Sequence, residues 1–369
     1  MKEILMLTTP ATYSPSVEKA IEDEEQVHRD LTETMRSIEE TTSKDYGHAV
    51  RAVHAKAHGV FQGELTIASN LPAELAQGLF ASPGTYKAVM RLSTQPGDIL
   101  DDAVSAARGM ALKVLDVPGE RLPESKGETS QNFVLASDPA FAAPDAKKFL
   151  GSLKQLAATT DKAEWAKKAL SATFRGLEDL LEAVGGQSAM LKSMGGVPIT
   201  HPLGGTYYSQ TAFRFGDYIA KFALVPVSDH LTQLKGQRVD VTGRPDALRE
   251  EVRNTIIEQG GEWELRVQLC TDLNKMPVED ASVVWDEKAS PYQAVARIMV
   301  APQISIGTEV QELTDEQVFF SPWHGLSAHQ PLGSVNRARR HTYEMSAEFR
   351  SKFNGCPMHD ARALEAVTS

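Results

Sequence analysis

The sequence predicts an α+β protein in which strands come first, helices interrupt them, further strands follow and one helix ends the order. Residues 48–137 contain short β-like runs broken by proline and glycine. The pattern changes to a helical period in residues 144–196, and strand-like runs return in residues 207–300. A last helix-like stretch covers residues 336–350. This order fits an antiparallel β-barrel with a helical insertion and a C-terminal helix beneath it.

The first element is a charged helical arm, which we place at residues 1–45, before a main domain of residues 46–369. Ser14 is a plausible N-cap because Pro15 suits the first helical turn, and no glycine follows until Gly47. The charge of this arm favours a solvated face, and the alternative is packing on a partner subunit. We expect a homo-oligomer, in the simplest case a dimer.

The helical insertion and the later strands are predicted from the spacing of apolar residues. Helical intervals separate Phe149, Leu153 and Leu156, and they recur later in Leu177, Leu180, Leu181 and Val184. The segments that read as later strands are Tyr207 to Phe215, Tyr218 to Pro226, Trp263 to Cys270 and Ala294 to Val300.

Composition agrees with a large soluble enzyme. The chain has 369 residues, of which 41% are hydrophobic, enough for one large domain or two. The formal net charge of −11 disfavours nucleic acid and anionic membranes as partners. Cys270 and Cys356 are too few for a disulfide framework, and the sequence shows neither a signal-peptide pattern nor the roughly 20 apolar residues of a membrane span. We therefore expect a cytoplasmic protein.

The last helix-like stretch carries the first candidate site. At about 100° per residue, Arg339, Tyr343 and Arg350 fall within about 40° of one another on one helical face, and the small Ser346 lies on the same stripe. A phenol, whose ordinary pKa is about 10, ligates a ferric ion as phenolate only where positive charge favours the anion. Arg339, one turn before Tyr343, supplies such a charge. The competing interpretation is a solvated basic face with one half-buried tyrosine.

A second group of polar residues lies in the first predicted strands. Arg91 and Ser93 share one face of a strand that Pro-Gly pairs bracket. Arg51 and His54, three residues apart, face opposite sides of a flat strand, so their joint use requires twist, a bulge or a strand end. Taken alone, His54 has an ordinary interpretation as a core histidine. A metal site that pairs it with His58 is disfavoured, because glycines interrupt any helix there.

Four blocks of sequence, taken together and in this order, resemble the haem catalases. They are Arg51 to Gly63, Met90 to Thr94, Arg108 to Val114, and the motif Arg339-x-x-x-Tyr343 followed by Arg350. The resemblance covers about residues 45–355 and implies the fold already described, with haem buried between the barrel and the helices. The loop of residues 319–325 is similar to that of short catalase-related peroxidases.

Carried over residue by residue, the resemblance implies a complete haem site. Tyr343 would be the axial iron ligand, and Arg339 would keep it ionised. His54 matches the distal histidine and Ser93 the serine that orients it. Val53, beside His54, is expected to contact the haem. The arginines that would hold the haem propionates are Arg51, Arg91 and Arg350.

The distal asparagine is harder to place. The block that should contain it reads Ser130-Gln131-Asn132-Phe133-Val134. We assign Asn132 to this role, and Gln131 is the alternative.

These residue types suit peroxide chemistry. Heterolytic cleavage of an O–O bond needs a base that moves one proton between the two oxygens, a task suited to imidazole. An anionic axial oxygen donates electron density to the iron. Planar guanidinium forks suit the carboxylates of haem b. The resemblance thus implies a haem b peroxidase that reduces hydrogen peroxide or organic hydroperoxides through a ferryl intermediate, with a small-molecule reductant as second substrate.

Other activities of the same fold stay open. They are a true catalase, a fatty-acid hydroperoxide lyase or isomerase of the allene oxide synthase type, and a haem-binding protein without catalysis. Allene oxide synthases of this kind typically carry threonine before the distal histidine, whereas this chain has Val53, which cannot bond to His54. Because the chain ends soon after Arg350, we also expect no bound NADPH.

Overall fold

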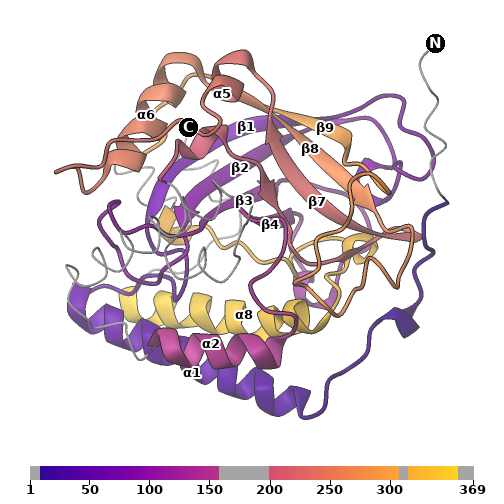
Figure 1. Ribbon diagram of the computed structural model, residues 1–369, viewed down its shortest axis with the longest axis horizontal. Helices are drawn as coiled ribbons and strands as arrows, with labels where there is room; N and C mark the ends of the chain where they lie inside the picture. Colours follow the sequence, from indigo (N-terminus) through magenta and orange to yellow (C-terminus); the bar gives the residue numbers. More distant parts are fainter. Residues whose placement is uncertain (1–8, 158–198, 307–314, 356–369) are drawn as a thin grey trace, which may run out of the picture.

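An antiparallel β-barrel lies against a layer of three helices, and two further helices cover another side of the barrel (Figure 1). The structure is a computed structural model that describes residues 9–157, 199–306 and 315–355. The predicted α+β class with an antiparallel barrel is therefore confirmed. None of the helices in these ranges combines the length and apolar character needed to cross a membrane.

The barrel closes through a ring of antiparallel pairings. The nine-stranded sheet has the order β5-β4-β3-β2-β1-β9-β8-β7-β6, and β5 pairs with β7 as well as with β4, so the eight strands other than β6 form a closed ring. Closure leaves those strands with neighbours on both sides. The strands are β1 (Ala57–Ile67), β2 (Thr85–Thr94), β3 (Arg108–Val114), β4 (Gln131–Ala136), β5 (Tyr207–Tyr208), β6 (Phe213–Phe215), β7 (Tyr218–Pro226), β8 (Gly261–Leu269) and β9 (Gln293–Val300).

The barrel interior is the main hydrophobic core. Alternate residues of each strand point inward, and the large buried side chains there include Phe61, Phe133, Phe222 and Trp263. The Phe222 ring packs edge-on against Phe133, with 4.8 Å between ring centroids. Side chains fill this interior, so we place the functional site elsewhere.

The outer face of β2 is buried too, which explains its unusual composition. Met90 and Leu92 belong to the interior cluster and are fully buried, yet Arg91 and Ser93 on the other face are each only 3% exposed. The helical layer covers this outer face (Figure 1). A strand covered on both faces must bury its polar residues, and buried polar residues need partners.

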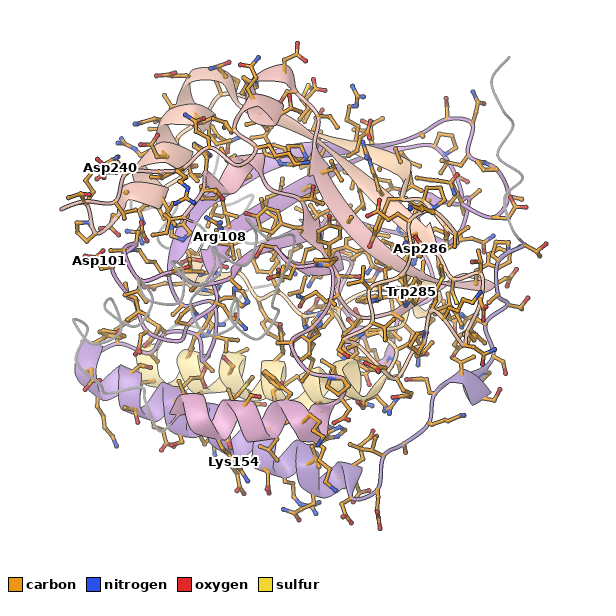
Figure 2. All side chains as sticks on the ribbon, in the orientation of Figure 1. Asp101, Arg108, Lys154, Asp240, Trp285 and Asp286 are labelled. Carbon is orange, nitrogen blue, oxygen red and sulfur yellow. The ribbon has the colours of Figure 1, made fainter. Side chains whose placement is uncertain are left out.

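The helical layer consists of α1 (Glu24–Tyr46), α2 (Ala146–Ala157) and α8 (Ser334–Asn354), and α8 lies nearest the barrel in Figure 1. Apolar residues at helical spacing on α1 meet α2 and α8, among them Leu31, Met35 and Ile38. Burying a side chain of this size stabilises the fold by about 1.5–3 kcal/mol. Lys154 of α2 lies on the side away from the barrel (Figure 2), where it pairs with Asp30 at 3.1 Å.

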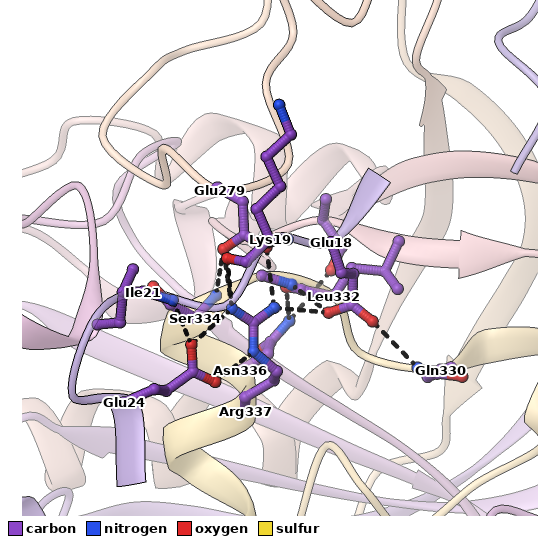
Figure 3. A network of polar contacts seen from close by, with 12 residues as sticks. Glu18, Lys19, Ile21, Glu24, Glu279, Gln330, Leu332, Ser334, Asn336 and Arg337 are labelled. Carbon is purple, nitrogen blue, oxygen red and sulfur yellow. Dashed lines mark hydrogen bonds and ion pairs between the residues drawn. The ribbon is translucent and has the colours of Figure 1, made fainter. Parts of the chain in front are cut away.

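A cluster of ion pairs ties the N-terminal segment to the start of α8. The Arg337 guanidinium pairs with Glu18 at 2.8 Å, with Glu24 at 2.6 Å and with Glu279 at 2.9 Å (Figure 3). These carboxylates raise the pKa of Arg337 against the opposing effect of burial. One guanidinium thus joins three segments that are distant in sequence.

The remaining helices are short or pack outside the helical layer. α6 packs on β1, and its Val252 and Ile256 reach the interior core. These remaining helices are α5 (Asp229–Gln233), α6 (Ala247–Gln259) and the 3₁₀ turns η1 (Pro15–Val17), η2 (Gly78–Phe80), η3 (Pro123–Ser125), η5 (Pro202–Gly204) and η6 (Ser327–His329).

Several element predictions were confirmed and others need correction. Three of the four later strands appear close to their predicted bounds, as β7, β8 and β9. The fourth predicted run, Tyr207 to Phe215, is divided into the short strands β5 and β6. Ser14 does act as a cap, but of the turn Pro15–Val17, and the long helix begins only at Glu24 after the left-handed residue Asp23. One side of that helix is buried within the chain instead of being solvated. The second helical repeat, Leu177 to Val184, lies outside the described residues.

Candidate functional site

The candidate site is a cavity between the outer face of the barrel and the helical layer. β2, β3 and β4 supply its barrel side, and α1 and α8 supply its helical side. The structure brings to this cavity most of the residues predicted for the site. Those that line it are Arg51, Val53, His54, Arg91, Ser93, Tyr343 and Arg350.

Small residues on the outer face of β3 make room for the cavity. Gly109 is the cross-strand partner of Ser93, and Ala111 is that of Arg91. A Cβ atom on Gly109 would lie 2.6 Å from the His54 ring, closer than such atoms approach. Glycine at this position is therefore needed for the His54 ring to approach the strand this closely.

His54 is held by a bend before β1 rather than by a strand. Its backbone has a φ of 58°, in the left-handed region, and its N–H donates to the Gln95 carbonyl at 2.7 Å. The ring Nδ1 lies 3.1 Å from the Ser93 hydroxyl oxygen. Arg51 and His54 both precede β1, so the expected strand at these residues was wrong. The bend before β1 brings the two residues to one cavity, at the cost of a strained residue.

The electrostatic surroundings keep His54 neutral. Burial, and then the positive charges of Arg91, Arg339 and Arg51, lower its pKa to about 3. A neutral imidazole with Nδ1 engaged by Ser93 leaves Nε2 available to accept a proton or a hydrogen bond. The arrangement suits a proton acceptor that is not already protonated near neutral pH.

Three guanidiniums gather at one edge of the cavity, and we call Arg51, Arg91 and Arg350 the arginine cluster. Arg91 donates from Nη1 to the His54 carbonyl at 2.9 Å, so it also holds the histidine backbone. Arg350 donates from Nη1 to the Glu316 carbonyl at 3.2 Å, while its buried Nε has no partner among the described residues. Burial lowers the pKa of Arg350 to about 10. A buried donor without a partner indicates that the cluster is suited to an anionic ligand.

Tyr343 reaches the cavity from α8, one turn after Arg339. Arg339 does not line the cavity: it donates to Asn336 Oδ1 at 3.1 Å and lies over the Phe141 ring at 5.5 Å from the centroid. Burial lowers the pKa of Arg339, and the charge of an ionised Tyr343 opposes this shift. The two groups are therefore close enough to interact electrostatically.

The predicted distal amide is not among the residues that line the cavity. Asn132 shares its face of β4 with Val134, which does line it, and both polar atoms of the Asn132 amide are buried without a partner among the described residues. Gln131 points to the other face, where its Oε1 accepts from the Leu326 N–H at 2.8 Å. The role of Asn132 stays a prediction.

Sequence reasoning missed a buried carboxyl group on α1. Glu39 Oε1 accepts from the Ala52 N–H at 3.1 Å and from the Ser346 hydroxyl. Burial raises the pKa of Glu39. This side chain bridges the segment that carries His54 and the helix that carries Tyr343. The sequence did contain a signal for this group: Glu39 lies four residues after Met35 and next to Ile38, so a carboxyl group falls on the apolar face of the helix.

The comparison with solved structures bears on the fold. A fungal catalase superposes with a TM-score of 0.58 at 17% identity, covering 87% of this chain and 62% of its own. This protein has a catalase-like fold. Catalase A from Saccharomyces cerevisiae agrees, with a TM-score of 0.57, 16% identity, and coverage of 85% of this chain and 64% of its own. The chain thus spans less than two thirds of the length of either catalase. No protein-family model and no curated protein matches the sequence.

Proposed function

We propose that this catalase-like protein is a haem-dependent oxidoreductase, a peroxidase that reduces hydrogen peroxide or organic hydroperoxides with a small-molecule reductant. The observation that carries the proposal is the cavity itself. His54 and Ser93 enter it from the barrel side, Tyr343 enters it from α8, and the arginine cluster lies at its edge.

The residues present fit haem b. The unpartnered Nε of Arg350 and the other guanidiniums of the cluster suit the two carboxylates of the cofactor. Tyr343 would bind the iron through its phenolate oxygen, and Arg339 would favour the ionised form. Phe319, Phe320 and Val134 give the cavity apolar walls that suit a porphyrin ring.

Haem, when bound, supplies the iron at which a peroxide O–O bond is cleaved. His54 accepts the peroxide proton at Nε2 and returns it to the leaving oxygen, which departs as water or an alcohol. Ser93 holds Nδ1 so that Nε2 keeps its direction. The low pKa of His54, about 3, ensures that the proton-accepting form is present near neutral pH. Arg91 steadies the same residue through its carbonyl.

Replacement of the proposed iron ligand tests the proposal. Tyr343→Phe should weaken haem binding at least tenfold and shift the Soret band, because the anionic ligand is lost while the ring remains. Tyr86→Phe, at the other end of β2 from Ser93, is the matched control and should bind haem normally. An unchanged Soret spectrum and normal turnover in Tyr343→Phe would show that the ligand lies elsewhere.

The activity of haem-loaded protein then distinguishes the proposed peroxidase from a catalase, a lyase or isomerase, and a binding protein. Initial oxygen release from hydrogen peroxide, normalised to haem content, measures catalase activity. Oxidation of an added reductant with hydrogen peroxide or an organic hydroperoxide measures the proposed peroxidase activity. Conversion of a fatty-acid hydroperoxide without a reductant would identify a lyase or isomerase instead, and an unreactive ferric Soret spectrum would identify a binding protein.

A further inference from the structure

A carboxylate of the chain itself lies in the arginine cluster. Arg51 Nη1 is 3.2 Å from Asp315 Oδ1, and Arg91 Nε donates to the same oxygen. Arg91 Nη2 lies 3.5 Å from the second oxygen, Oδ2. The Asp315 side chain is 20% exposed, so this contact forms at the rim of the cavity and not deep in the core.

The charges explain why Asp315 is held there. Burial alone would raise the pKa of Asp315, but Arg91 and Arg51 outweigh it and lower the value to about 2. Burial and the neighbouring Arg91 lower the pKa of Arg51, which shows that the guanidiniums repel one another. An anion between them relieves this repulsion.

The backbone around Asp315 is anchored by guanidinium nitrogens other than those that contact its side chain. Arg51 Nη2 donates to the Asp315 carbonyl at 2.6 Å and to the Val318 carbonyl at 3.0 Å. Arg350 holds the Glu316 carbonyl at 3.2 Å. The carboxylate can therefore give up its guanidinium contacts while these backbone hydrogen bonds hold the segment in place.

We propose that Asp315 is an internal counter-ion that competes with the carboxylates of the cofactor for Arg51 and Arg91. This inference rests on the proposed function, because it takes the arginine cluster as the site of those carboxylates. Asp315 then stabilises the cofactor-free protein and lowers its affinity for the cofactor. The opposite possibility is that Asp315 keeps its contacts in the loaded protein and orients the arginines for binding.

Neutral variants of Asp315 separate these possibilities. Asp315→Asn and Asp315→Ser should each bind haem about tenfold more tightly than wild-type protein, since no internal anion has to leave the cluster. The cofactor-free variants should melt about 2–4 °C lower, because the guanidiniums lose their counter-ion. Glu258→Gln is the control: its carboxylate is exposed on α6 and away from the cavity, so this variant should leave the affinity unchanged.

Metal-free porphyrins isolate the contribution of the carboxylates. Protoporphyrin IX carries both carboxylates but no iron, so its affinity, followed by fluorescence, should rise in the neutral variants by about the same factor as that of haem. Protoporphyrin dimethyl ester lacks the negative charges and should bind wild-type and variant proteins equally. A wild-type affinity in both neutral variants, or a weaker one, would overturn the competition.

The outcomes also distinguish this inference from the proposed function. Wild-type protein that binds neither haem nor protoporphyrin would overturn the proposed function and the competition with it. Wild-type protein that binds haem through Tyr343 while its affinity is insensitive to Asp315 would overturn only the competition.

Discussion

The two faces of β2 carry different kinds of side chain and meet different parts of the molecule. Met90 and Leu92 point into the barrel and meet other apolar side chains, whereas Arg91 and Ser93 point outward to the cavity. Both pairs are buried, so burial does not distinguish the residues of the core from the residues proposed for the site. The difference lies in the partners: the interior residues need close packing, and the outer residues need charges and hydrogen bonds. Changes on the two faces should therefore affect different measurements.

Removal of the proposed proton acceptor, His54, which contacts Ser93 in the cavity, should have the largest effect. His54→Ala should lower the rate of peroxide cleavage by haem-loaded protein about 10²–10⁴-fold, the usual contribution of a positioned acid–base group. Haem binding should persist, because Tyr343 and the arginine cluster are unchanged. Stopped-flow measurement of the haem spectrum after mixing with peroxide gives this rate.

His230→Ala, on α5 and away from the cavity, is the control for loss of a histidine as such. A wild-type rate in His54→Ala would assign the proton transfer to another group. A failure of both variants to load haem would point to a general loss of structure.

Removal of an interior side chain should leave the chemistry intact and weaken the fold. Phe222 is fully buried and contacts Phe133, Phe213 and Phe215. Phe222→Ala should lower the free energy of unfolding by about 3–5 kcal/mol because it leaves a cavity in the core. Urea unfolding measures this change, and turnover per bound haem below the transition should stay near the wild-type value.

Phe353→Ala supplies the surface control, since Phe353 is 48% exposed at the end of α8. Its effect on stability should stay within about 0.5 kcal/mol. If the two phenylalanine variants were equally stable, the barrel interior would not be the main source of stability.

The smallest effect should appear in the acid stability of the protein. The pKa of His54 is about 3 in the folded chain and about 6.5 in an unfolded one. Between these values the unfolded chain binds more protons, so the stability contributed by neutral His54 is present above pH 6.5 and is lost as the pH falls. His54→Ala should move the midpoint of acid unfolding about 0.5 pH unit lower.

Circular dichroism across pH 7 to pH 2 measures that midpoint. His329, buried among interior phenylalanines with a pKa lowered to about 3, acts in the same direction and remains in the variant. A midpoint that does not move, or that moves upward, would show that His54 is not held neutral by the fold.

Much of the fold could be predicted because it depends on short-range patterns. Alternation placed Arg91 and Ser93 on one face of a strand, and the spacing of Tyr343 and Arg350 placed both on one helical stripe. α6 was missed although Leu248, Val252 and Ile256 recur every four residues, a helical signal that was available. The order of strands and helices, together with the resemblance to catalases, predicted the barrel.

The candidate site depended on contacts that no local pattern contains. Asp315 meets Arg51 across 264 positions of the sequence, and Glu39 meets Ser346 across 307. The left-handed backbone of His54 is held by hydrogen bonds with the Gln95 carbonyl and the Arg91 guanidinium, both distant in sequence. The periodicity of apolar residues therefore cannot predict these contacts or this backbone conformation.

The sequence by itself thus determined which elements form and which side chains share a face, because dihedral preferences and side-chain periodicity act over a few residues. Only the tertiary structure decided that the outer face of β2, the bend at His54 and the helix of Tyr343 enclose one cavity. It also decided that Asp315 lies among the arginines there. Those juxtapositions follow from barrel closure and helix packing, which bring together residues hundreds of positions apart and bury their charges together.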